Sequence, residues 1–146
     1  MTPSIIVQVA DAVVAELNAS PVAAEAKFQA QRHYRPVFEL PQLKTVHVSV
    51  VPRGITIEPQ DRSSNSHDVA IDVAIQQRVQ AGDQETLDTL MSLVQSIADC
   101  LRCRRLTTMP TAIWVKTENL PIYSPDHLET KGTFTSVLTV TYRVVQ

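Results

Sequence analysis

Two cysteines three positions apart, Cys100 and Cys103, are the residues whose types and spacing most suggest chemistry. Two thiols at this spacing on a helix share a face, as in a redox pair or one half of a zinc site. Their position opposes both uses, because the surrounding pattern predicts a helix that ends here. A redox pair is favoured at a helix N-terminus, and zinc needs a second pair, but the chain has only 2 cysteines. We therefore expect the thiols to pack as small apolar groups.

The four histidines, His33, His47, His67 and His127, do not have the spacing of a zinc-binding helix motif. The segment 124–127 (SPDH) contains the side-chain types of a serine triad. Residues this close in one turn cannot be arranged in series along a proton path. We expect a turn at the Ser-Pro-Asp sequence, followed by a short helical turn.

Charged residues form two further groups. Asp68 and Asp72 have an even spacing, so one strand would present them on the same side, where we interpret them as part of a solvent-facing surface. Arg102, Arg104 and Arg105 crowd the predicted end of a helix, where positive charge complements the helix dipole. We favour this capping role over phosphate binding, with subunit contact as the functional alternative. These patterns predict no enzyme activity, no cofactor and no metal site.

Composition narrows the class of protein. The 146 residues, 44% of them hydrophobic, suit a single domain spanning 1–146. The 3 glycines are isolated, which excludes glycine-rich phosphate-binding loops. A net charge of -2 provides no broad positive field for nucleic acid. No stretch approaches the roughly 18 apolar residues of a membrane span, and the few cysteines fit a reducing cytosol.

Two helices are predicted from apolar residues recurring at three- and four-residue intervals. The first begins after Ser4, a favourable N-cap, and ends at Ser20-Pro21. The second begins after Asp83, which can cap it, and its apolar stripe reaches Leu101. Its last turn contains Arg102, Arg104 and Arg105, and Thr107 and Pro110 end it.

Five strands are predicted, at residues 27–34, 45–51, 67–79, 111–116 and 133–145. The clearest is the third, because its apolar residues alternate strictly with polar ones. Its buried face would consist of Val69, Ile71, Val73 and Ile75.

Two long polar segments, 52–66 and 117–132, are predicted to be loops, with 58–66 a mobile one. The order helix, strand, strand, strand, helix, strand, strand predicts an α+β domain. We expect a mostly antiparallel or mixed β-sheet of about four to five strands, with two main helices packed on one face.

Four further segments are informative together: 71–79 (IDVAIQQRV), 90–106 (LMSLVQSIADCLRCRRL), 118–128 (ENLPIYSPDHL) and 134–143 (FTSVLTVTYR). They resemble segments of small virion proteins of tailed phages and prophages, namely tail terminator and neck (head-tail joining) proteins. They are packing patterns rather than catalytic signatures. The resemblance covers roughly residues 45–146.

The resemblance implies a tail terminator that forms a homo-oligomeric ring, with six copies expected. Such a ring caps the tail tube and joins it to the head-side connector or stopper. It belongs to the virion tail or neck, is assembled in the host cytoplasm without a membrane, and lets genomic DNA pass through its lumen. A near-neutral charge suits that passage.

Other functions remain open from the sequence. A head-tail connector or stopper has no feature that separates it from a terminator here. A small ligand-binding domain would use the cysteine pair or the Asp72 face, and a nucleic-acid-binding module would use the arginine cluster.

The two loops are the predicted contacts between rings, and the final strand is predicted to lie at or near a subunit boundary. The candidate contact residues are Arg53, Arg62, Arg104, Arg105, Tyr123, His127 and Tyr142.

Overall fold

The structure is a computed structural model of the 146-residue chain. The residues it describes are 3–34, 45–80, 82–102, 105–119, 122–126, 128 and 132–146. Three helices are present in this part of the chain: α1 (Ile5–Asn18), α2 (Pro21–Ala26) and α3 (Gln84–Leu101). The strands are β1 (Gln31–Arg32), β2 (His47–Pro59), β3 (Asn65–Arg78), β4 (Arg105–Leu106), β5 (Met109–Glu118) and β6 (Thr133–Val145).

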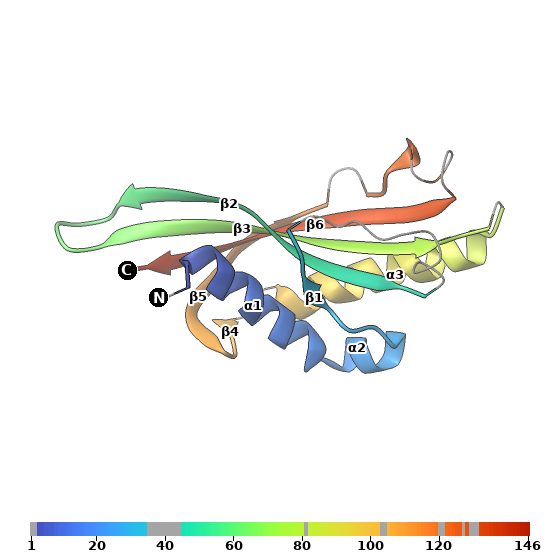
Figure 1. Cartoon of the computed structure of the whole chain (residues 1–146), viewed down its shortest axis with the longest axis horizontal. Helices are drawn as coiled ribbons and strands as arrows, with labels where there is room; N and C mark the ends of the chain where they lie inside the picture. Colours follow the sequence, from blue (N-terminus) through green and yellow to red (C-terminus); the bar gives the residue numbers. More distant parts are fainter. Residues whose placement is uncertain are drawn as a thin grey trace.

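The strands form one six-stranded sheet in the order β1-β2-β3-β6-β5-β4. Only β1 and β2 are parallel, and every other neighbouring pair is antiparallel, so the sheet is mixed. The helices lie on one side of it (Figure 1). The predicted α+β class is confirmed, but the sheet has one strand more than the upper predicted number. The additional strand, β4, has two residues, too few to leave a periodic signal in the sequence.

Both long helices begin where their caps predict. The Ser4 hydroxyl accepts a hydrogen bond from the Val7 amide at 3.4 Å. The Asp83 carboxylate accepts from the Thr86 amide at 3.1 Å and from the Thr86 hydroxyl at 2.6 Å. These bonds satisfy amides that have no partner inside the helix.

The core lies between the helices and one face of the sheet. Val69, Ile71, Val73 and Ile75 are fully buried, as their alternation in the sequence predicts. The buried residues of the helices that complete the core include Val9, Val13, Leu17, Leu90, Val94, Ile97 and Leu101. We call the opposite face of the sheet, which carries Asp68 and Asp72, the open face.

The predicted strand at 27–34 is mostly wrong. The segment begins at the end of α2, where the chain turns through Lys27 at a left-handed φ of 58°. The Asn18 side chain accepts from the Ala30 amide at 2.7 Å and donates to its carbonyl at 3.1 Å. The Asn18 side chain therefore takes the place of a neighbouring strand at Ala30, and only the two residues of β1 pair with β2.

The predicted mobile loop at 58–66 is also wrong. β2 and β3 form a long hairpin that is paired as far as Pro59 and Asn65. Asp61 organises the turn, because its carboxylate accepts from the amides of Ser63 and Ser64, both at 2.8 Å. Pairing of the backbones requires no buried side chains, so a polar sequence can continue as a ribbon. Figure 1 shows this hairpin projecting past the helices, beyond the start of α1 and the end of β6.

Candidate functional site

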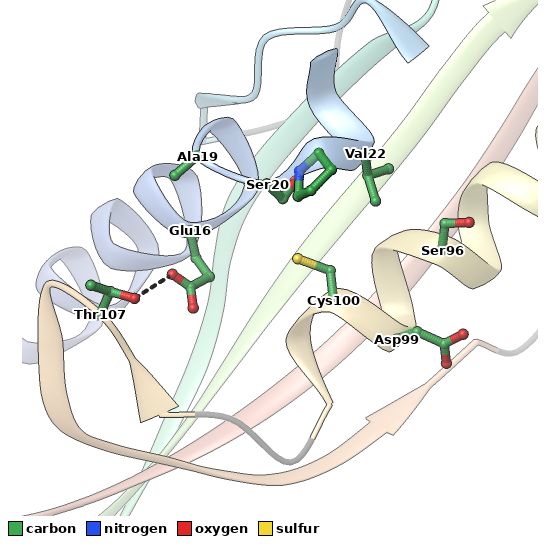
Figure 2. A pocket seen from close by; sticks show the side chains of 9 residues that line it. Glu16, Ala19, Ser20, Val22, Ser96, Asp99, Cys100 and Thr107 are labelled. Atoms are coloured by element: carbon green, nitrogen blue, oxygen red, sulfur yellow. Dashed lines mark hydrogen bonds between the residues drawn. The ribbon is translucent and has the colours of Figure 1, made fainter. Parts of the chain in front are cut away.

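The cysteine region forms a cavity of about 430 Å³ between α1, α2 and the end of α3 (Figure 2). Cys100 lies in its wall, free and only 8% exposed, as the packing interpretation predicts. Cys103 is outside the described residues, so the pair as such is not described. Within the described ranges, no group of three or more His, Cys, Asp or Glu side chains could hold a metal ion.

The polar groups of this cavity do not form a catalytic arrangement. Glu16 accepts a hydrogen bond from the Thr107 hydroxyl at 2.9 Å. Asp99 points away from the Cys100 sulfur (Figure 2). A nucleophile needs a base within hydrogen-bonding reach, and the labelled carboxylates offer Cys100 no such contact.

Tyr142 was a predicted contact residue, and the structure corrects this. Its side chain is fully buried between sheet and helices. Burial raises the pKa of its hydroxyl, and the negative charge of nearby Glu16 raises it further. Among the described residues the hydroxyl has no hydrogen-bond partner. The alternation of β6 places even-numbered residues on the helix side of the sheet. Tyr142 therefore faces the core and not the surface.

His67 and Ser124 have structural roles. His67 is buried, with Nδ1 3.3 Å from the Val144 carbonyl oxygen. Pro125 and Asp126 begin a short helical turn, in which the Leu128 amide donates to the Ser124 carbonyl at 3.2 Å. This confirms the predicted turn. His127, the remaining member of that segment, lies outside the described residues.

The open face carries opposite charges in pairs. Arg143 donates twice to Asp68, from Nε at 2.8 Å and from an Nη atom at 3.1 Å. This bonding lowers the pKa of Asp68 and raises that of Arg143. Asp72 accepts from the Thr139 hydroxyl at 2.7 Å and from Arg53 at 3.4 Å. Asp68 and Asp72 therefore share a solvent-facing surface, as predicted, and each forms an ion pair with an arginine there.

A hollow of about 310 Å³ crosses the open face between β2, β3, β5 and β6. Its charged lining residues are Arg53, Lys116 and Glu118, and Lys116 pairs with Glu118 at 3.0 Å. Arg53 also has a carboxylate partner, Asp72, at 3.4 Å, so each of the two cations of the hollow already lies beside an acidic side chain.

The other predicted contact residues that the structure describes are exposed, unlike Tyr142. Arg53 and Arg62 lie exposed on the hairpin, and Tyr123 is 39% exposed and stacks on Phe134. Arg105 is exposed in β4, whereas Arg104 is outside the described residues.

The predicted basic last turn of the second helix is wrong. α3 ends at Leu101, and Arg102 is already extended, with a ψ of 137°. Arg105 therefore does not lie in the helix but in β4. The chain leaves the helix here to form β4, which the sequence pattern did not predict.

The final strand is predicted to lie at or near a subunit boundary, and this stays a prediction. Within the chain, β6 is an interior strand of the sheet. It pairs with β3 along its length and with β5 from Thr139 to Arg143. Both backbone edges of this part are therefore used within the chain.

Sequence reasoning missed a free strand edge on the hairpin. β1 pairs with β2 only at Ser49 and Val50, so among the described residues no strand pairs with the outer edge of β2 farther along. Ile55 and Ile57 on this segment are 40% and 56% exposed. The alternation Ile-Thr-Ile after Gly54 is the strand signal that could have revealed it.

Comparison with known proteins shows a shared fold. The chain matches no protein-family model and no curated protein. It is similar to a chain in the solved structure described as "Virion of native gene transfer agent (GTA) particle". The TM-score is 0.69 at 16% sequence identity, and the alignment covers 99% of this chain and 100% of that one. The two chains therefore share their architecture from end to end.

A search of the described helices for membrane-spanning segments found none that is long and apolar enough.

Proposed function

We propose that this chain is a structural virion protein of a tailed phage or phage-like particle. The observation that carries the proposal is the end-to-end similarity of fold to a chain of a gene transfer agent virion. The paired charges of the open face also suit a surface that meets other proteins and DNA without binding a small molecule tightly.

Within this class we propose a tail terminator. Its copies form a ring, six in number, that caps the tail tube and meets the head-side connector or stopper. The protein has no enzymatic role and needs no cofactor. It resides in the tail or neck of the virion, is assembled in the host cytoplasm, and genomic DNA passes through the ring. Supporting this finer role are the four sequence segments that resemble terminator and neck proteins.

The test separates particles into heads without tails and tails without heads, each carrying an epitope-tagged chain. Negative-stain imaging with antibody-bound gold should show one label at the head-proximal end of free tails. Label on free heads alone would identify the connector or stopper, which is the alternative function. Label on neither fraction would refute a virion role.

A further inference from the structure

The sheet has two free strand edges on opposite sides. One is the segment of β2 from Arg53 to Glu58, which lies beyond the reach of β1. The other is the segment of β5 from Lys116 to Glu118, because β4 pairs with β5 only at Met109 and Ile113 and a bulge separates Trp114 from Lys116. Both statements concern the part of the chain that the structure describes. Each edge has backbone N–H and C=O groups directed away from the sheet, which another strand can pair with.

The β2 edge has the character of a docking strand. Ile55 and Ile57 pair with Val69 and His67, so they lie on the helix side of the sheet. Ile55 and Ile57 are 40% and 56% exposed, and the hairpin that contains them projects past the helices (Figure 1). Proteins protect such edges with prolines and bulges. In β2 these features stand only at the limits of the segment, with a bulge between Pro52 and Gly54 and a second proline at position 59.

The two edges are complementary in two respects: the directions of their strands, and the face of the sheet on which their side chains lie. β2 is antiparallel to β3, β3 to β6, and β6 to β5, so β2 and β5 run in opposite directions. A second copy placed beside the first in the same orientation therefore presents its β5 antiparallel to β2. Thr117 lies on the helix side, opposite Val140, and Lys116 lies on the open face, opposite Thr141.

We propose that the β2 edge of one copy pairs with the β5 edge of the next copy, with Ile57 opposite Thr117 and Glu58 opposite Lys116. This register keeps each residue facing its own side. It also leaves β1 and β4 beyond the two ends of the contact, so neither blocks it. Glu58 and Lys116 are both exposed and of opposite charge.

The pairing uses two different surfaces of the same chain, so it is head-to-tail. Such an interface closes into a ring or continues as a filament, whereas a contact between identical surfaces stops at a dimer. The inference rests on the proposed function in naming the neighbour as a second copy of this chain. In the proposed ring, these strand pairs would hold neighbouring copies together.

Charge reversal tests the pairing in the purified full-length chain. Sedimentation velocity over a concentration series gives the dissociation constant of self-association for wild type, Glu58→Lys, Lys116→Glu and the double variant. Each single reversal should raise that constant about fivefold, because like charges face each other across the strands. The double variant should return to within about twofold of wild type. Glu25→Lys, an equal charge change on an exposed residue of α2, should have no effect.

Three results would overturn the inference: a wild-type chain that stays monomeric at its highest soluble concentration, a double variant weaker than either single one, or sensitivity at Glu58 alone. The last result would mean that the β2 edge meets another surface. These outcomes are distinct from failure of the proposed function, because that function is decided by the position of tagged chains on particles. If the double variant restores self-association but free tails carry no gold label, the strand pairing is supported and the terminator function is not. If free tails carry the label but the double variant does not restore self-association, the function is supported and the pairing is not.

Discussion

At the scale of single residues, the hydroxyl of Tyr142 is a buried polar group without a hydrogen-bond partner among the described residues. A buried polar group without a partner costs about 1–3 kcal/mol, and the described residues provide this hydroxyl with none. Tyr142→Phe should therefore raise the free energy of unfolding by about 1 kcal/mol. Urea denaturation measures the change, and Tyr123→Phe at the surface serves as the matched control. A clear loss of stability would show that the hydroxyl is hydrogen-bonded.

The ion pair of Asp68 and Arg143 predicts a pH dependence. Bonding to Arg143 holds the pKa of Asp68 below its ordinary value of 3.8 in the folded chain. The pair therefore stabilises the fold above about pH 4, and this contribution is lost as the pH falls from there through the lowered pKa. Asp68→Asn should flatten the acid limb of stability against pH, measured as melting temperature. Asp88→Asn, an exposed carboxylate on α3, is the control, and an equal flattening there would contradict the assignment.

At the scale of elements, the β2 edge and β6 should behave in opposite ways in hydrogen exchange. Amides of β6 from Thr139 to Arg143 lie between two strands, so they should exchange slowly in the free chain. Amides of β2 from Arg53 to Glu58 that point outward should exchange fast there and slow down on self-association. Mass spectrometry of free and associated chain measures both. Unchanged exchange in β2 together with slowing at β6 would instead indicate that the final strand lies at or near the subunit boundary.

The hairpin and the start of β1 show why elements were mispredicted. Strand prediction depends on alternation that one buried face imposes, and the tip of the hairpin has no buried face. The segment 58–66 is polar on both sides, yet its ends are paired because β3 continues beside it. Near β1 the reverse happens, since the Asn18 side chain satisfies backbone groups that a strand would otherwise satisfy.

At the scale of the whole molecule, one core between one sheet and its helices predicts one cooperative unfolding transition. Trp114, the single tryptophan, lies on β5 and packs against this core, whereas far-ultraviolet circular dichroism reports on all helices and strands. The two signals should give the same midpoint in urea. Separate midpoints would mean that the chain contains more than one unit, against the single domain predicted for residues 1–146.

The sequence by itself determined the elements whose side chains meet the core. Ser4 and Asp83 begin the two long helices, β6 spans the residues predicted for it, and the buried face of β3 follows its alternation. These features are local, since a cap or a repeat of apolar residues acts over a few positions. The order of these elements also predicted the α+β class.

Only the tertiary structure decided which strands are neighbours and which edges are left free. Strand order depends on contacts between residues far apart in the chain, such as Asp72 with Thr139 and Asp68 with Arg143. The burial of Tyr142 depends on helices lying over β6. Among the described residues, the outer edge of β2 is left free because β1 is only two residues long. Spacing within one segment carries no information about what lies beside it, so the surfaces available for assembly became visible only in the folded chain.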